Sequence, residues 1–244
     1  MSGQAILRVE GLSKRFRGLL ATNNVSFSVT AGSITSIIGP NGAGKSTVFN
    51  LLTGYLQPTA GEIHFNGRCL NGLDTHRIAG LGIARAFQIA RPFRELTVSE
   101  NVRIGALFGK QGPRDVAEVT ARSLGLAGLE DLADAPATSL TAGQLRHLEI
   151  ARAIATRADL LLADEPCAGL NPTETAAMIN VLRTVRGHGV TVLLVEHDMP
   201  SVMEVSDRII VLDAGSKIAE GPPSEIAADP RVIAAYLGTP DENG

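Results

Sequence analysis

The chain has 244 residues, enough for one large α/β domain or two small ones. Its content of 44% hydrophobic and 19% charged residues is typical of a globular protein, and with only 4% aromatic residues the core must be mainly aliphatic. A net charge of −3 gives no electrostatic reason to expect nucleic acid as a partner, because nucleic-acid-binding domains usually carry a basic surplus. Cys69 and Cys167 lack CxxC spacing, which argues against a zinc site and favours a reducing compartment.

Neither a leader peptide nor a membrane span is expected. Residues 1–9 lack the apolar core of a signal peptide, and no apolar run reaches the roughly 18 residues that a membrane helix needs. Lys14, Arg15 and Arg17 form a basic cluster that we interpret as a solvated strand end. We therefore expect a soluble chain whose membrane contact, if any, goes through a partner.

The predicted elements alternate between strands and helices along the chain. The first are strands at 6–9, 24–29 and 33–38, a helix at 45–53, and strands at 61–67 and 83–88. Residues 99–135 look helical with a break at 109–113, and a helix follows at 144–155. The rest of the chain predicts strands at 160–163 and 190–195, helices at 173–185, 200–205 and about 230–238, and a hairpin formed by 209–212 and 217–219.

This alternation predicts a parallel sheet with helices on both faces, and the early strands suggest an antiparallel piece beside it. The helical stretch over about 90–158 would be a subdomain inserted into this core. The expected organisation is one α/β domain over 1–244 with a short C-terminal helix.

The strongest motif lies between a predicted strand and a predicted helix. It matches GxxxxGK[ST], the Walker A pattern, and comprises Gly39, Pro40, Asn41, Gly42, Ala43, Gly44, Lys45, Ser46 and Thr47. Glycines let successive backbone N–H groups turn toward phosphate oxygens, and the following helix adds its positive N-terminal end. We expect Lys45 to reach the β- and γ-phosphates and the Ser46 hydroxyl to ligate Mg²⁺. Between a strand and a helix, this motif indicates the fold of phosphate-loop nucleotide hydrolases.

Two carboxylates, Asp164 and Glu165, follow the aliphatic run at 160–163. An acidic residue at this place orients Mg²⁺ in phosphate-loop enzymes, so we assign Asp164 to the metal and Glu165 to the attacking water. Without the phosphate loop, a solvated strand-end pair would be the better interpretation.

Four further segments narrow the prediction from phosphate-loop enzymes in general to one family. Residues 140–144, which include Thr141, Ala142, Gly143 and Gln144, resemble the signature segment of ABC ATPases. Gln88 resembles their Q-loop glutamine, the segment 168–171 their D-loop, and His197 their switch histidine. Taken singly, Gln88 reads as a strand-end amide and His197 as a surface histidine.

The resemblance implies a mechanism. Two ABC nucleotide-binding domains, as a homodimer or a heterodimer, pack head to tail. Each ATP is then held by the phosphate loop of one domain and by the signature segment of the other, with Gly143 toward the γ-phosphate. Gln88 would contact Mg²⁺ and the γ-phosphate and relay to the membrane partner, and His197 would contact the γ-phosphate. The preference for ATP over GTP also rests on the resemblance.

The sequence departs from the common signature at two positions, where Thr141 replaces Ser and Ala142 replaces Gly. The aromatic residue that often stacks on adenine has one candidate, Phe16, whose alternative interpretation is a core residue of the first strand.

The finer resemblance is to ATP-binding subunits of branched-chain amino acid importers, carried by the segments 84–93, 168–174 and 223–238. It implies integral-membrane permease subunits, an indirect solute-binding protein, and a place at the cytoplasmic face of the membrane. Related importers for urea, amides or other amino acids, a lipid-export ATPase and a non-transport ABC ATPase remain alternatives. A soluble kinase with a phosphate loop is a more distant one.

Overall fold

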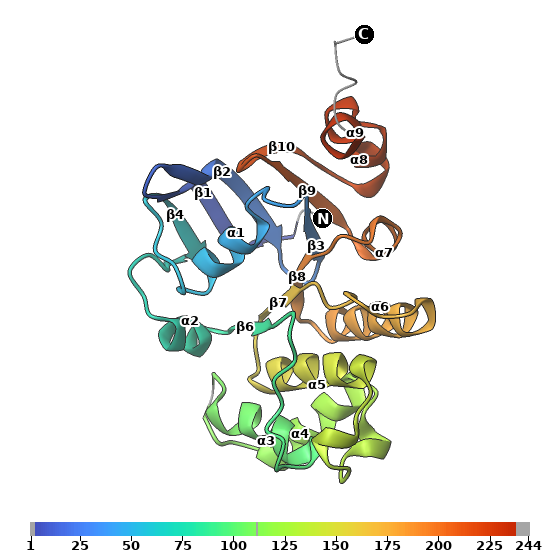
Figure 1. The fold of residues 1–244 in the computed structure, drawn as a ribbon. Coiled ribbons are helices and arrows are strands. Elements are labelled where there is room, and N and C mark those ends of the chain that lie inside the picture. The colour runs from blue at the N-terminus through green and yellow to red at the C-terminus, as the bar shows by residue number, and fades with distance from the viewer. Residues whose placement is uncertain (1–2, 111, 238–244) are drawn as a thin grey trace.

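The computed structural model describes residues 3–110 and 112–237, which form two sheets and a separate layer of helices (Figure 1). The first sheet is antiparallel and has the strand order β2-β1-β4-β5. Its strands are β1 (Ala5–Phe16), β2 (Leu19–Thr30), β4 (Ala60–Phe65) and β5 (Arg68–Cys69). Along β2, buried and exposed side chains alternate from Val25 to Val29, as expected for a strand with one face on the core.

The second sheet has the order β10-β9-β3-β8-β7-β6 and is parallel except for the terminal hairpin of β9 and β10. Its strands are β3 (Ile34–Ile38), β6 (Ile83–Ala86), β7 (Leu160–Asp164), β8 (Thr191–Val195), β9 (Arg208–Asp213) and β10 (Ser216–Gly221). All residues of β3, β7 and β8 are buried, because helices or the other sheet cover both of their faces. The predicted parallel core with an antiparallel piece is confirmed.

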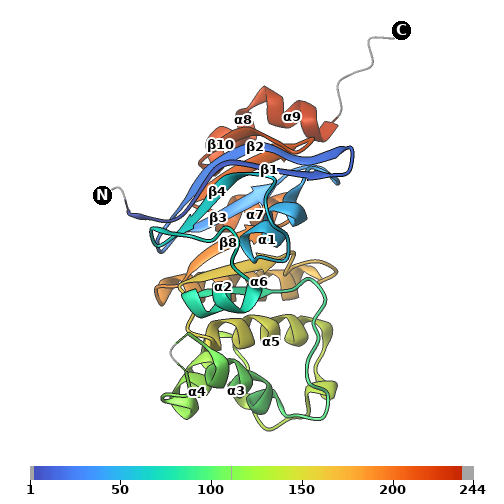
Figure 2. The ribbon, with the colours of Figure 1, turned by 90° about the vertical axis from the view of Figure 1, so that its left-hand side faces the viewer.

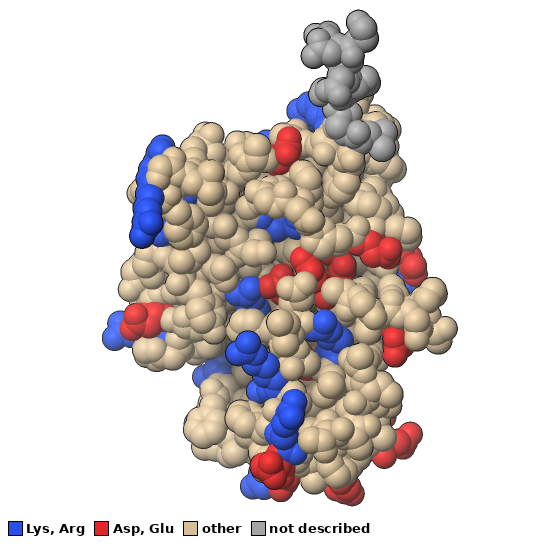
Figure 3. Space-filling view, in the orientation of Figure 1, with Lys and Arg blue, Asp and Glu red and all other residues tan. Residues whose placement is uncertain are grey.

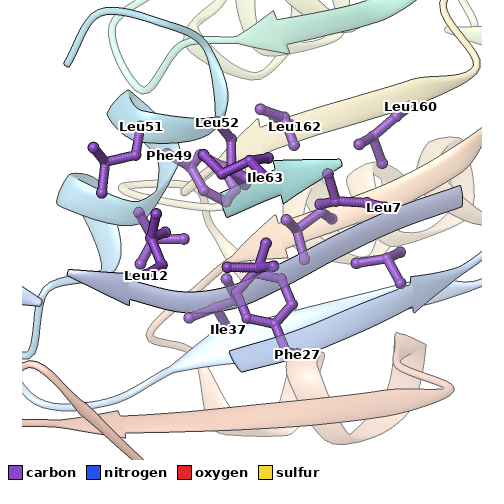
Figure 4. Packing of buried hydrophobic residues seen from close by; sticks show 14 of the residues in the cluster. Leu7, Leu12, Phe27, Ile37, Phe49, Leu51, Leu52, Ile63, Leu160 and Leu162 are labelled. Carbon is purple, nitrogen blue, oxygen red and sulfur yellow. The ribbon is translucent and has the colours of Figure 1, made fainter. Parts of the chain in front are cut away.

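Helix α1 (Lys45–Leu52) lies between the two sheets. Figure 4 shows Phe49, Leu51 and Leu52 of this helix packed among side chains of both sheets, with Leu7 and Leu162 nearby. This cluster therefore fixes the start of α1, and with it the preceding loop, relative to both sheets. On the opposite face of the parallel sheet, α6 (Pro172–Gly187) and α5 (Ala142–Ala155) cover a second cluster.

The helical layer lies at one end of the molecule (Figure 2), and its helix α5 packs next to β6 and α6 (Figure 1). It contains α3 (Val98–Phe108), α4 (Val116–Leu126), two single turns at Glu130–Leu132 and Ala137–Ser139, and α5. These helices enclose their own apolar cluster, which includes Val102, Leu124 and Leu148. The break expected at 109–113 falls between α3 and α4, and Gly109 caps the end of α3.

The C-terminal part packs on β9 and β10 through α7 (Met199–Val205), α8 (Pro223–Ala228) and α9 (Pro230–Leu237). The last residue of the helix expected over 230–238 lies outside the described residues. No helix within the described residues is long and apolar enough to cross a membrane.

Several expected boundaries were wrong. The strand expected over 83–88 ends at Ala86, so Phe87 and Gln88 lie beyond it and are exposed. The first strand runs to Phe16 rather than Val9, because Gly11 and register shifts let a polar stretch stay paired with β2. The short helices α2 (Thr75–Leu81) and α8 were missed.

Candidate functional site

The phosphate loop, residues 39–47, joins the end of β3 to the start of α1 and runs close to neighbouring backbone. A Cβ on Gly39 would lie 2.0 Å from the Leu212 carbonyl oxygen, and one on Gly44 would lie 2.6 Å from that of Ala21. Both glycines have positive φ, +150° and +100°, so a side chain is excluded by both space and conformation. Gly44 caps α1 without a side-chain hydrogen bond, which leaves the first N–H groups of the helix for an anion.

Lys45 is buried at 5% exposure and bends back over the loop. Its Nζ donates to the Gly39 carbonyl at 2.7 Å and to the Pro40 carbonyl at 2.9 Å. Burial lowers the pKa of Lys45, and the nearby charge of Glu165 opposes that shift. The ammonium therefore lies against two carbonyl groups at the start of the loop.

Other loop residues lie at the surface of this cradle. Asn41, Gly42 and Ser46 are exposed, Ala43 is buried, and Thr47 is partly buried within α1. The Ser46 hydroxyl thus belongs to the first turn of α1, beside the uncapped N–H groups.

Glu165 follows β7 and has both carboxylate oxygens occupied by predicted site residues. His197 Nε2 donates to its Oε1 at 2.7 Å, and Gln88 Nε2 donates to its Oε2 at 2.5 Å. The backbone of Glu165 has φ +49°, in the left-handed region that non-glycine residues seldom adopt. Three residues that are distant in sequence therefore meet at one carboxylate.

Asp164, the last residue of β7, is 8% exposed and paired with an arginine that the sequence analysis did not single out. Arg85 Nη2 donates to Asp164 Oδ2 at 2.5 Å, and Arg85 Nη1 donates to Asn50 Oδ1 at 2.8 Å. This guanidinium also lies over the rings of Phe49 and Phe87. An arginine inside the otherwise apolar segment 83–86 was the signal that could have revealed it.

The second missed residue is Glu196, which is 2% exposed directly after the apolar strand β8. It accepts backbone hydrogen bonds from the turn that carries Glu165 and from His197. A carboxylate directly after four buried apolar residues, 192–195, was the available signal, because buried charges are found only where hydrogen bonds satisfy them.

Oxygen donors for Mg²⁺ are present at this edge of the sheet. No group of three or more His, Cys, Asp or Glu side chains within 3–110 and 112–237 is placed to hold a metal ion. The proposed set of Ser46, Gln88 and Asp164 instead offers a hydroxyl, an amide oxygen and one carboxylate. These are hard oxygen ligands of the kind that Mg²⁺ uses when phosphates and water complete its shell, so the residues fit this ion.

The signature residues form the start of α5, in the helical layer. Thr141 is the N-cap: its Oγ1 accepts from Gln144 N at 3.3 Å, and Gln144 Oε1 accepts from Thr141 N at 2.9 Å. The helix therefore begins at Ala142 rather than at Gln144. Ala142 is exposed, whereas Gly143 is buried against Glu174, whose Oε1 would lie 3.1 Å from an added Cβ. Among the described residues, no hydrogen bond joins 141–144 to the phosphate loop.

The segment 168–171 leads into α6, where Asn171 and Glu174 form a further capping box. Glu174, in the first turn of α6, also lies next to Gly143, so the start of α6 lies beside the signature segment within one chain.

Phe16 ends β1 in the hairpin with β2 and is 41% exposed. The alternative that it belongs to the core is therefore wrong. Lys14 Nζ lies 5.3 Å from the centre of its ring, and the strand beside it, β2, passes the phosphate loop at Ala21. The ring is available for stacking, which stays a prediction.

A cleft of about 880 Å³ opens between β6 and the helical layer, with Arg85, Gln88 and Asp164 in its lining. The exposed apolar residues Phe87, Ile89 and Phe108 also line it. Figure 3 shows Lys and Arg side chains gathered over the helical layer below β6, and Asp and Glu side chains in a band between β7 and α7. The nucleotide site and this surface cleft therefore share residues.

The chain belongs to the ABC transporter family, whose model matches residues 22–168. This family membership makes it an ATP-hydrolysing subunit. A second family model, described as branched-chain amino acid ATP-binding cassette transporter, matches residues 216–242.

The high-affinity branched-chain amino acid transport ATP-binding protein BraF of Pseudomonas aeruginosa is 45% identical over 249 residues, which cover 96% of this chain and 98% of that protein. A crystal structure of an ATP-binding cassette of an ABC transporter in its ADP conformation has a TM-score of 0.87 at 32% identity and covers 97% of this chain and 100% of that one. A dimeric cassette in a post-hydrolysis state, bound to ADP and Pi, has a TM-score of 0.77 at 28% identity and covers 89% of this chain and 98% of that one.

Proposed function

We propose that this chain powers the import of branched-chain amino acids by hydrolysing ATP at the site built around Glu165. The observation that carries the site assignment is the convergence of His197 and Gln88 on that carboxylate, at 2.7 and 2.5 Å. The name of BraF and the match over residues 216–242 support the solute class. Import of urea, an amide or another amino acid is the alternative for the solute.

Each residue has a role that follows from its position. Lys45 and the N–H groups of the loop bind the β- and γ-phosphates, and the Ser46 hydroxyl and Asp164 hold Mg²⁺. When bound there, Mg²⁺ supplies positive charge that offsets the developing charge on the phosphate oxygens. Phe16 stacks on the adenine.

Glu165 orients the attacking water and accepts its proton. His197 holds this carboxylate and contacts the γ-phosphate, and Gln88 contacts the carboxylate and the metal shell. Because Gln88 is exposed and lines the surface cleft, a partner that moves it changes the surroundings of Glu165.

The working unit is a dimer of nucleotide-binding domains. In the capping box of α5 the Thr141 side chain accepts from the N–H of Gln144 and not from those of the exposed Ala142 and the buried Gly143. A helix N-terminus of this kind suits the γ-phosphate of an ATP held by the partner's phosphate loop. The dimeric cassette with ADP and Pi supports this arrangement.

The permease contact lies at the cleft between β6 and the helical layer, where the segment 90–158 acts as an inserted unit. The exposed side chains of Phe87, Ile89 and Phe108 offer apolar area to a permease segment, and Gln88 lies beside them. The subunit then sits at the cytoplasmic face of the membrane, and a solute-binding protein acts on it only through the permease.

The test is copurification of tagged E165Q protein from detergent-solubilised membranes with Mg-ATP, followed by reconstitution. We expect hydrophobic permease subunits in the eluate, and in proteoliposomes ATP hydrolysis by the unmutated complex that rises with leucine or valine. Recovery of ribosomal or DNA-repair proteins without a permease would overturn the transport role. Stimulation by urea or an amide instead of leucine would overturn the solute class alone.

A further inference from the structure

Glu196 joins the two loops that carry the proposed catalytic pair. It follows β8, is 2% exposed, and uses both of its carboxylate oxygens. Oε1 accepts from the backbone N–H of Cys167 at 2.7 Å, and Oε2 accepts from the backbone N–H of His197 at 3.0 Å. Cys167 lies two residues after Glu165, so one buried side chain bridges the turn after β7 and the loop after β8.

The turn after β7 needs such support because its backbone is strained. Glu165 has φ +49°, a conformation that persists in a non-glycine residue only where the surroundings enforce it. Two hydrogen bonds from the end of β8 hold this turn. Glu165 N donates to the Val195 carbonyl at 2.8 Å, and Cys167 N donates to Glu196 as above.

A carboxylate suits this position because it has two oxygens that can each accept a hydrogen bond. Two N–H donors face it, and a carboxylate offers an acceptor to each. A glutamine would offer one oxygen and would turn its NH₂ group toward the other N–H. The Cys167 thiol beside it is 6% exposed, and burial, together with the charge of Glu196, raises the pKa of that thiol.

We propose that Glu196 is a positioning residue that sets the distance between the Glu165 carboxylate and the His197 imidazole. Its hydrogen bonds go to the backbone N–H groups of the two loops and its charge faces the Cys167 thiol, so it acts through the pair and not on the nucleotide. The inference rests on the proposed roles of Glu165 and His197, whose 2.7 Å contact depends on the spacing of these loops.

The first experiment is a double-mutant cycle of E196Q and H197A in the full chain. E196Q should lower kcat by at least about tenfold, because small displacements of catalytic groups are costly, while ATP affinity stays within about twofold. In the H197A background, E196Q should add less than about a twofold loss, since its effect passes through His197. E204Q is the matched control, because Glu204 is an exposed carboxylate that pairs with Arg183 on the surface.

The second measurement uses Cys167 as a reporter of the turn. C69S leaves it as the single thiol of the chain, and its alkylation by iodoacetamide reports opening of this segment. The labelling variant is E196D, because it keeps the charge that raises the pKa of the thiol but is one methylene too short to span both amides. E196D should speed labelling by about tenfold or more, and E204Q should not.

The outcomes distinguish the positioning role of Glu196 from the proposed function of the site. Multiplicative losses in the cycle, or a wild-type kcat in E196Q together with wild-type labelling in E196D, would overturn the role of Glu196 and leave the active site as proposed. A wild-type kcat in H197A would count against the proposed function itself, and the labelling rate would then decide whether Glu196 holds the turn.

Discussion

The two halves of the proposed nucleotide site differ in how they use their polar groups. On the phosphate-loop side, Lys45, Glu165, His197 and Gln88 come from four segments and contact one another or loop carbonyls at the edge of the parallel sheet. On the signature side, Thr141 and Gln144 satisfy each other within one turn of α5. The first half is a convergence of long-range contacts, whereas the second is a local helix cap on a separate layer.

This difference indicates that the two halves of the site have different functions. A cluster held by the core of two sheets keeps its geometry without a partner, as hydrolysis chemistry requires. A capped helix end that faces outward binds no phosphate until a second domain brings one to it. Substitutions on the first side should therefore change chemistry or binding in any state, and substitutions on the second should act only when two domains meet.

The largest effect is expected for E165Q. Loss of the carboxylate removes the acceptor for the proton of water, so turnover should fall by about 10²- to 10⁴-fold while ATP still binds. Size-exclusion chromatography with Mg-ATP should then show a trapped dimer, and a phosphate-release assay should show the loss. Unchanged hydrolysis would remove Glu165 from the catalytic role.

The next effect is expected for K45A. The substitution removes the charged donor from the loop, and ATP affinity should weaken by about 10- to 100-fold, the value of one charge-assisted hydrogen bond. Equilibrium binding of a fluorescent ATP analogue measures it, with K217A on β10 as the control for loss of a lysine. Wild-type affinity in K45A would contradict the phosphate-loop assignment.

The same contrast between local and long-range contacts explains which parts of the fold and the site could be predicted from the sequence. The phosphate loop, the carboxylate pair and the parallel core could be predicted because each depends on short-range pattern, such as glycine spacing or an aliphatic run. Arg85 and Glu196 stand out in the sequence only as charges beside apolar segments, and their partners could not be predicted because those depend on strand order. Only the adjacency of β6 and β7, and of β7 and β8, brings them to Asp164 and to the turn of Glu165.

Errors at element boundaries have equally local causes. The start of α5 was placed two residues late because Gly143 was taken as a break, while the capping box of Thr141 and Gln144 overrides the low helix propensity of one glycine. Helix α2 was missed because seven residues of mixed polarity, with one buried side chain, Ile78, give no clear periodicity.

A smaller effect is expected on the signature side for G143A. The new methyl group would lie 3.1 Å from Glu174 Oε1, so Glu174 and the start of α5 must shift by a few tenths of an ångström. We expect maximal ATPase activity to fall by about five- to tenfold through weaker closure of the dimer, as one misplaced contact to the γ-phosphate would cause.

The affinity of isolated G143A protein for ATP should stay unchanged, which equilibrium binding under monomeric conditions can establish. T141A tests the cap separately and should cost about 1 kcal/mol of stability, measured by urea unfolding. A loss of monomer affinity in G143A would break the division between the two halves.

The smallest effect concerns His147, which belongs to the same helix as the signature residues. Its Nδ1 lies 2.9 Å from the Ala127 carbonyl oxygen. Burial lowers the pKa of His147, and the hydrogen bond to this carbonyl opposes that shift without cancelling it. The unfolded chain, with an ordinary histidine pKa of about 6.5, therefore binds a proton at a pH where the folded chain does not.

The sign of the pH dependence follows. Stability is fully present above the unfolded pKa and falls as the pH drops through it toward the lower folded pKa, with a slope of at most about 1.4 kcal/mol per pH unit. Urea unfolding between pH 8 and 5.5 should show a shallower decline in H147Q than in the unmutated chain. H188Q is the matched control, since that histidine is exposed at the end of α6.

If stability depends on pH in the same way in H147Q and in the unmutated chain, the folded protein protonates His147 without cost. Helix α5 then tolerates a charge beneath its first turns. A shallower profile in H147Q would instead identify α5 as the element that weakens first in acid. Because the phosphate loop is anchored in a different cluster, between the two sheets, monomer ATP affinity should then outlast ATPase activity as the pH falls. That order of loss is a direct measure of how independent the two halves of the site are.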